Sequence, residues 1–279
     1  MRVLLVEDEP LVAMDLQFEL EDAGAEVVAV AVDVGQGGES LETIRQRALD
    51  CGAVEAYVAD AREEFAAGYC MPALQANALY MDAYPLVSAV SRPVIVKHLV
   101  AAAQQFGATT VAHGCTGKGN DQVRFELAFY GLKPDIKVIA PWRLPKFYER
   151  FAGRSALLEY AESKGIPVTQ TKSKPWSTDE NLFHISYEAG ILEDPNTTPP
   201  DDMWKLTQSP QKAPDTPEKI TIEFKQGIPV KVTKTESGES YTDSVDVFLQ
   251  LNALARKHGI GRVDIVENRF IGVKSRGCY

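Results

Sequence analysis

A glycine-rich segment, His113-Gly-Cys-Thr-Gly-Lys-Gly-Asn-Asp-Gln-Val-Arg-Phe-Glu126, lies between a short apolar run and an amphipathic one. Residues 109–112 before it predict a buried strand, and residues 121–130 predict a helix. A glycine-rich turn that leads from a strand into a helix offers backbone N–H groups and the positive helix end to an anion. The segment therefore predicts an α/β fold with a small-molecule site at this turn.

The side chains of the same segment suit a ligand that carries both signs of charge. Asn120 and Asp121 can hold an amine or an amide, and Arg124, one helical turn further on, can clamp a carboxylate. A tight turn without any ligand is the alternative interpretation of such glycines. A Walker A loop is excluded, because only two residues separate Gly114 from Gly117.

Composition restricts the class of protein. The chain has 279 residues, of which 45% are hydrophobic and 24% charged, as in soluble globular proteins. A net charge of -10 argues against general nucleic-acid binding, and the sequence contains no apolar run long enough for a membrane span. The acidic start is unlike a signal peptide, and the scattered cysteines and histidines have no metal-ligand spacing. We therefore expect a cytoplasmic protein with reduced thiols and no bound metal.

Strand and helix patterns alternate through the first part of the chain. Strands are predicted at residues 2–6, 26–32, 53–58, 109–112 and 136–140, and helices at 11–22, 40–51, 92–106 and 122–130. Repeated β-α-β units imply a parallel sheet covered on both faces, with ligands at the carboxyl ends of the strands.

The pattern changes after residue 165, where proline-punctuated loops predominate. Gln226-Gly227, between strand patterns at 220–224 and 229–232, predicts a hairpin. A helix is predicted at 244–258 with Gly259 as its C-terminal cap, followed by strands at 262–267 and 270–273. We expect an α/β domain at residues 1–168 and a second domain at 169–279.

Residues from about Val27 to Tyr279 resemble the argininosuccinate synthases. The motifs that carry the resemblance are the glycine-rich segment itself together with Asp33-Val-Gly-Gln-Gly37, Ser91-Arg-Pro93, Pro175-Trp-Ser177, His184-Ile-Ser-Tyr-Glu-Ala-Gly190, Gly261-Arg-Val-Asp-Ile-Val-Glu-Asn-Arg269 and Lys274-Ser-Arg-Gly277.

The resemblance implies a ligase of arginine biosynthesis that joins citrulline to aspartate. Its co-substrate is ATP with Mg²⁺, and the ATP is cleaved to AMP and pyrophosphate. It implies an adenine nucleotide alpha hydrolase-like domain followed by a truncated α+β synthetase domain. Members of this family form homotetramers and continue well beyond the position of Tyr279, so we expect an incomplete subunit interface.

The resemblance also assigns binding roles to individual residues. Those implied for aspartate are Thr116, Asn120 and Asp121. Those implied for citrulline are Tyr84, Asn120, Arg124, Ser177, Ser186, Glu267 and Tyr279. Those implied for ATP are Val32 and Gly114. Ala89 departs from the family, many of whose members place a serine there toward citrulline.

The first residues depart further from the family. Where its members carry the phosphate loop Ser-Gly-Gly-Leu-Asp-Thr-Ser, residues 7–13 of this chain read Glu-Asp-Glu-Pro-Leu-Val-Ala. Pro10 removes an N–H donor, and three carboxylates stand where ATP phosphates would dock. One like-charge contact at about 4 Å costs on the order of 4 kcal/mol at an effective dielectric near 20, roughly a thousandfold in affinity. We expect impaired ATP binding.

Residues 1–30 instead resemble the start of a response-regulator receiver domain. In that family the acidic pair, here Glu7 and Asp8, helps to bind Mg²⁺ beside a phosphoacceptor aspartate. Asp60 ends the third predicted strand, but Ala61-Arg-Glu-Glu follows it, as in the synthases. Three hypotheses follow: an active ligase, a non-catalytic remnant or chimera that binds only citrulline or aspartate, and a receiver-type signalling module.

Overall fold

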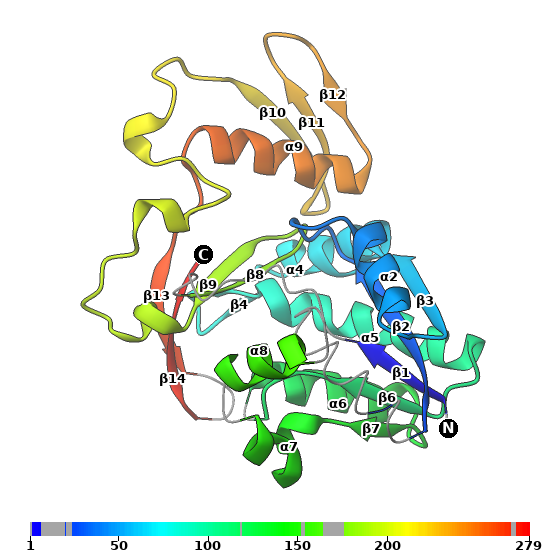
Figure 1. The fold of residues 1–279 in the computed structure, drawn as a ribbon. Helices are drawn as coiled ribbons and strands as arrows, with labels where there is room; N and C mark the ends of the chain where they lie inside the picture. Colours follow the sequence, from blue (N-terminus) through cyan, green and yellow to red (C-terminus); the bar gives the residue numbers. More distant parts are fainter. Residues whose placement is uncertain are drawn as a thin grey trace. The chain divides into compact units, whose positions relative to one another are not determined.

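The computed structural model describes residues 2–6, 20, 24–117, 119–151, 154–163, 176–268 and 272–279 (Figure 1). The chain forms two compact units, each described by itself below. Unit 1 comprises Met1–Asp33, Gly38–Ala61 and Arg92–Ser173, and unit 2 comprises Val34–Gly37, Arg62–Ser91 and Lys174–Tyr279. The boundary expected between residues 168 and 169 lies outside the described residues and stays a prediction.

Unit 1 is built on a five-stranded parallel sheet, as predicted. Its strands follow the order β3-β2-β1-β6-β7. Their bounds are β1 (Arg2–Val6), β2 (Glu26–Asp33), β3 (Glu55–Asp60), β6 (Thr110–His113) and β7 (Lys137–Ile139). All four residues of β6 are buried, as expected for a central parallel strand covered on both faces.

Helices cover this sheet. They are α2 (Leu41–Asp50), the part of α5 (Val87–Gln105) from Arg92 onward, α6 (Asn120–Leu132), α7 (Pro145–Arg150) and α8 (Arg154–Ser163), with a short 3₁₀ turn η2 (Pro141–Arg143). On one face, Val3 and Leu5 of β1 pack with Phe147, Phe151 and Leu157 from α7, the residue after it, and α8. Apolar burial on this face fixes the sheet against its helices.

Helix α5 begins at Val87, five residues before the predicted start at Arg92. The prediction was wrong because Pro93 is typical of a first helical turn, whereas here it lies inside the helix. Ser91 and Val94 on either side of this turn are fully buried. The free energy gained by burying these residues therefore exceeds the cost of the backbone hydrogen bond that proline removes.

Strand order reverses between β1 and β6, which makes their shared carboxyl edge the topological switch point of the sheet. The register pairs Val6 with His113. The carboxyl ends of these two strands therefore lie side by side.

Unit 2 contains antiparallel sheets. One sheet has the order β13-β14-β9-β8, a second has β10-β11-β12, and β4 pairs with β5. The strands are β4 (Leu79–Tyr80), β5 (Tyr84–Pro85), β8 (Ser177–Glu180), β9 (Ile185–Glu188), β10 (Ile220–Lys225), β11 (Ile228–Lys234), β12 (Ser240–Tyr241), β13 (Asp264–Asn268) and β14 (Lys274–Cys278). Its helices are α3 (Arg62–Phe65), a π-helix η1 (Ala66–Cys70), α4 (Met71–Gln75), 3₁₀ turns η3 (Gly190–Glu193), η4 (Asp201–Met203) and η5 (Pro210–Lys212), and α9 (Ser244–Lys257).

Local signals in unit 2 are mostly confirmed. Gln226 and Gly227 both have positive φ, at 52° and 82°, and connect β10 to β11 as the predicted hairpin. Asp243 caps α9 by accepting hydrogen bonds from the next turn, and Gly259 follows the helix with φ of 65°.

The prediction of a last strand at residues 270–273 was wrong. Residues 272–273 are not in a strand, and β14 starts at Lys274. Its position is set by pairing on both sides, with β13 from Asn268 opposite Lys274 and with β9 at Gly277 and Cys278. These long-range pairs, and not the apolar run at 270–273, therefore determine where the strand lies. The sequence analysis also did not predict β8 and β9.

No helix in the described ranges has the length and apolar character that crossing a membrane requires.

Candidate functional site

The glycine-rich turn of unit 1 connects β6 to α6, as predicted. Its last residue, Gly119, is the N-cap of α6 and has extended φ and ψ. Within the described residues, no side chain of the N-cap bonds the first turn of this helix. The N–H of Gly119 donates to the carbonyl of Thr116 at 3.1 Å. The helix N-terminus therefore keeps N–H groups and a partial positive charge for a ligand.

At two positions of this turn a side chain would clash with neighbouring atoms, so glycine is required. A Cβ at Gly117 would lie 2.6 Å from the carbonyl oxygen of Trp142, and one at Gly119 would lie 2.8 Å from the hydroxyl of Thr116. Neither residue has a left-handed φ. Close approach, and not conformational freedom, explains glycine at these two positions.

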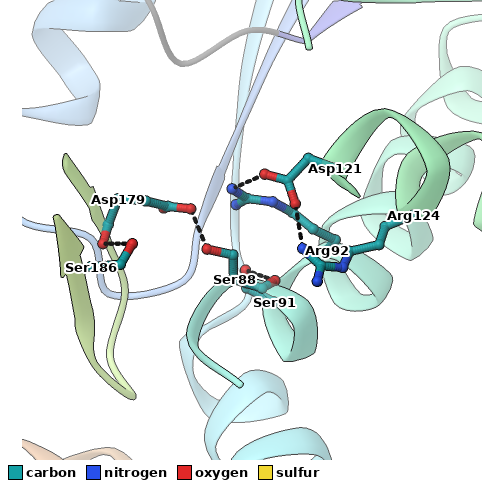
Figure 2. Close-up of polar contacts among 7 residues, drawn as sticks. All are labelled: Ser88, Ser91, Arg92, Asp121, Arg124, Asp179 and Ser186. Atoms are coloured by element: carbon teal, nitrogen blue, oxygen red, sulfur yellow. Dashed lines mark hydrogen bonds and ion pairs between the residues drawn. The ribbon is translucent and has the colours of Figure 1, made fainter. Parts of the chain in front are cut away.

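Asp121, in the first turn of α6, is held by two arginines (Figure 2). Its Oδ2 accepts from Arg92 Nη2 at 2.8 Å, and its Oδ1 accepts from Arg124 Nη1 at 2.8 Å. Burial raises the pKa of Asp121, but the charges and hydrogen bonds of Arg92 and Arg124 outweigh burial and hold the pKa below its ordinary value. The three side chains form a network with a net positive charge.

This network has acceptor capacity left for a ligand. A carboxylate offers about four lone-pair positions, of which the two arginines use two. Next to it, Asn120 Oδ1 is buried and accepts no hydrogen bond from any described residue. A buried acceptor without a donor is costly, so this oxygen fits an N–H or ammonium group that the ligand supplies.

His113 ends β6 and is almost completely buried. Its Nε2 lies 3.9 Å from Glu126 Oε1, which is ion-paired with Arg143 at 3.1 Å, and its ring stacks on Phe125 at 5.8 Å. Burial lowers the pKa of His113, Glu126 raises it and Arg143 lowers it, with a net decrease. The imidazole is therefore neutral near neutral pH. The two predicted ATP contacts, Val32 and Gly114, are buried at the ends of β2 and β6.

Unit 2 contains a second polar cluster, built from hydroxyls (Figure 2). Ser88 donates to Asp179 Oδ2 at 2.5 Å, and Ser91 donates to the carbonyl of Ser88 at 2.9 Å. Ser186 on β9 is paired with Asp179 on β8 and donates to its carbonyl at 3.4 Å. All three serines are buried.

The other predicted citrulline residues of unit 2 lie on β5, β8, β13 and the residue after β14. Glu267 is buried on β13, and Tyr279 is buried against Leu86 and Ile265. Tyr279 also exchanges two backbone hydrogen bonds of 2.8 Å with Val263. Ser177 is exposed at the start of β8, and the side chain of Tyr84 lies outside the described residues.

Beside this cluster the backbone is strained. Ala189 follows β9 with φ of 66° and ψ of -178°, a region that glycine alone adopts readily.

The structure adds residues that sequence reasoning missed. Arg92 holds Asp121 although 29 positions separate them, and Ser88 bonds Asp179 across 91 positions. Ser91-Arg-Pro93 and the start of β8 were recognisable only as family motifs, with no local signal for a polar contact. The two sets belong to different units: Thr116, Asn120, Asp121 and Arg124 to unit 1, and Tyr84, Ser177, Ser186, Glu267 and Tyr279 to unit 2.

Of the acidic residues considered for Mg²⁺, the structure describes only Asp60. Glu7 and Asp8 lie outside the described residues, and Asp60, the last residue of β3, pairs with Asp33 in the sheet. Within the described residues no three His, Cys, Asp or Glu side chains form a group that could hold a metal ion.

Comparison with known proteins identifies the family. Residues 12–167 match the Arginosuccinate synthase N-terminal HUP domain, and residues 176–279 match the Arginosuccinate synthase C-terminal domain. The chain is 57% identical over 264 residues to argininosuccinate synthase of Saccharomyces cerevisiae, covering 93% of this chain. It is 53% and 52% identical over 260 residues to the enzymes of Gallus gallus and Homo sapiens, again covering 93% of this chain. The chain spans about 63% of the length of the yeast and human relatives. It belongs to the argininosuccinate synthase family.

Proposed function

We propose that this chain carries the amino-acid recognition of a ligase that joins citrulline to aspartate with cleavage of ATP to AMP and pyrophosphate, in arginine biosynthesis. The observation that carries the proposal is the buried acceptor of Asn120 next to the network of Asp121 and Arg124 at the start of α6. An α-amino acid needs an acceptor for its ammonium group and a cation for its carboxylate, and this arrangement supplies both.

Aspartate would bind in unit 1 through Thr116, Asn120 and Asp121. The hydroxyl of Thr116 is exposed at the turn, so it is accessible to a ligand carboxylate. Asp121 stays ionised because the arginines depress its pKa, so it attracts the ammonium group. The family's chemistry requires this amine to attack, and a fixed acceptor pair orients it.

Citrulline has a neutral ureido group, and the hydroxyls of unit 2 suit it. Ser186 and Glu267 are buried, so water would compete little with their hydrogen bonds to the ligand. Ser186 would donate to the ureido oxygen or accept from a ureido N–H, and Glu267 would accept from a ureido N–H. Ser177, Tyr84 and Tyr279 would add contacts in unit 2. Asn120 and Arg124 of unit 1 are the further residues that the family resemblance implies for citrulline, and Arg124 suits a carboxylate. ATP activates the ureido oxygen when it is bound. Mg²⁺, a homotetramer and a cytoplasmic location are further proposals that rest on the family.

A second candidate function is a non-catalytic remnant or chimera that binds citrulline or aspartate without ATP. The pairing of Val6 with His113 supports it, because the acidic residues Glu7, Asp8 and Glu9 directly follow Val6. Negative charge there would repel the phosphates of a nucleotide that approaches Gly114 and Val32.

A pyrophosphate-release assay with citrulline, aspartate and ATP separates the two functions. The active ligase releases pyrophosphate only when all three substrates are present, whereas a remnant stays at background. Calorimetry then measures the binding of each substrate separately. Micromolar ATP binding would exclude the remnant, and background release in a chain that binds all three would exclude the ligase.

The matched variant replaces residues 7–13 with Ser-Gly-Gly-Leu-Asp-Thr-Ser. We expect this variant to gain ATP affinity by roughly a thousandfold if repulsion and missing N–H donors are the cause. An unchanged ATP affinity would show that residues 7–13 do not limit nucleotide binding.

A further inference from the structure

Unit 2 contains a second concave site, distant in sequence from the residues assigned above. A pocket of about 390 Å³ opens between η4, η5 and the end of α9. We name it the basic pocket, and its charged lining residues are Lys205, Lys212, Arg256, Arg262 and Asp201. Four cations and one carboxylate give this lining a net charge of +3, although the whole chain has a net charge of -10.

Arg262 is fixed in the basic pocket by neutral partners. Its Nε donates to Thr207 Oγ1 at 2.8 Å, and its Nη2 donates to the carbonyl of Thr207 at 2.7 Å. Its guanidinium carbon lies 4.6 Å from the ring centroid of Trp204. No carboxylate neutralises the guanidinium in these contacts, and three of its five N–H donors are not used by Thr207. The charge is therefore held in place and remains available.

The remaining cations of the basic pocket are likewise uncompensated. Within the ranges that the structure covers, no carboxylate lies at ion-pair distance from Lys205, Lys212 or Arg256. Other basic residues of unit 2 do have such partners, and Lys257, which directly follows Arg256, is paired with Glu218. The four cations exceed the one carboxylate of the lining and repel one another, so a bound anion would stabilise this arrangement.

The backbone around the basic pocket is anchored. Gln208 N donates to the carbonyl of Arg256 at 3.1 Å, which ties the lining loop to the end of α9, and Lys205 N donates to Tyr187 Oη at 2.8 Å. Gly259 approaches so closely that a Cβ there would lie 2.8 Å from the carbonyl of Gln208. A preorganised lining lowers the entropy cost of binding.

We propose that the basic pocket binds a small anion with two or more negative charges, such as a phosphate-bearing or polycarboxylate metabolite. The guanidinium groups of Arg256 and Arg262 suit planar or tetrahedral oxyanions, and the lysines add mobile point charges. The volume lies in the lower range of small-ligand sites. This inference is independent of the ligase function, because none of these residues is among the assigned substrate contacts.

Calorimetry of the full chain with pyrophosphate and, separately, with citrate tests the proposal. We expect saturable binding of at least one probe, weakened about tenfold by Arg256→Gln and about tenfold by Lys212→Gln. The matched control is Lys225→Gln, which removes the same charge from an exposed position at the end of β10 and leaves the affinity unchanged. Arg256 and Lys212 are exposed, so both variants should keep the thermal unfolding midpoint.

The two probes identify the source of the anion. Binding of pyrophosphate alone assigns phosphate chemistry, binding of citrate alone assigns a polycarboxylate, and binding of both assigns multivalent charge as the common requirement. The proposal is overturned if neither probe saturates. It is also overturned if Arg256→Gln and Lys212→Gln both leave the affinity for the probe unchanged, because the probe then binds at another site. An equal fall in affinity in the control Lys225→Gln would overturn it as well.

Discussion

The two units hold a partly buried carboxylate by different means. In unit 1, Asp121 lies between two guanidinium groups, and its side chain is 32% exposed. In unit 2, Asp179 accepts from the buried hydroxyl of Ser88, and the buried hydroxyl of Ser186 bonds its carbonyl. Two charged donors bond the carboxylate of Asp121, whereas a neutral hydroxyl bonds Oδ2 of Asp179.

This difference has chemical consequences. A carboxylate between two arginines stays ionised and leaves a net positive network that selects charged ligand groups. Buried hydroxyls carry no net charge and fix the orientation of neutral groups through directional hydrogen bonds. Under the proposed function, unit 1 would bind an amino acid's charged end, and unit 2 a neutral polar group such as a ureido group.

The largest effect that distinguishes the two clusters is expected for Asp121→Asn. It removes one counter-charge from Arg92, whose side chain is 12% exposed, and should lower the free energy of unfolding by about 3 kcal/mol. Urea denaturation measures the loss. The control Asp135→Asn removes an exposed partner of Lys133 and should leave stability unchanged. A loss as small as that of the control would show that the network is no stronger than a surface ion pair.

Next in size is Gly117→Ala, which tests the close approach at the turn of unit 1. The added Cβ meets the carbonyl of Trp142, so the turn must shift, at a cost of about 2 kcal/mol in unfolding free energy. Gly131→Ala near the end of α6 is the control, since a Cβ there meets no atom. Alanine favours a helix by up to about 1 kcal/mol, so the control should gain stability. Equal effects in the two variants would contradict the steric explanation.

Ser88→Ala tests the hydroxyl cluster of unit 2. It removes a hydrogen bond to the carboxyl group of Asp179 from a buried position, and we expect a loss of about 1.5 kcal/mol in urea denaturation. Ser163→Ala is matched to it, because Ser163 donates to a neutral carbonyl, that of Tyr160, on an exposed helix end. If Ser88→Ala costs as much as Asp121→Asn, the contrast between the two clusters fails.

The smallest effect concerns pH, because each unit has one histidine with a depressed pKa. Burial lowers the pKa of His113 in unit 1 and of His184 in unit 2, although a backbone hydrogen bond raises the latter in part. Below the ordinary pKa of 6.5 the unfolded chain binds more protons than the folded chain, so stability falls as the pH decreases. Asp121, with its lowered pKa, adds a second loss only as the pH falls below 3.8.

Unfolding free energies measured between about pH 7.5 and about pH 5 test this prediction. His113→Asn and His184→Asn should each flatten the dependence on pH, one through unit 1 and the other through unit 2. An unchanged slope in both variants would mean that neither histidine is neutral in the folded protein.

Much of the architecture could be predicted from local sequence. The alternation of strands and helices predicted the parallel sheet, because each element carries its own hydrophobic period. Gln226-Gly227 predicted a hairpin, and Gly259 predicted the end of α9, because glycine adopts positive φ readily. For the candidate site, the sequence analysis assigned Asp121 and Arg124 to a ligand. Their contact with each other is local, because one helical turn separates them.

The sequence by itself therefore determined the elements whose cause is local: periodicity, turns, caps and contacts one helical turn apart. Only the tertiary structure decided that Arg92 completes the network of Asp121, that Ser88 reaches Asp179, and that β14 begins at Lys274. Each of these depends on strands or helices that meet after long chain separations. Loop closure and burial select such contacts over the whole fold, and no short segment encodes them.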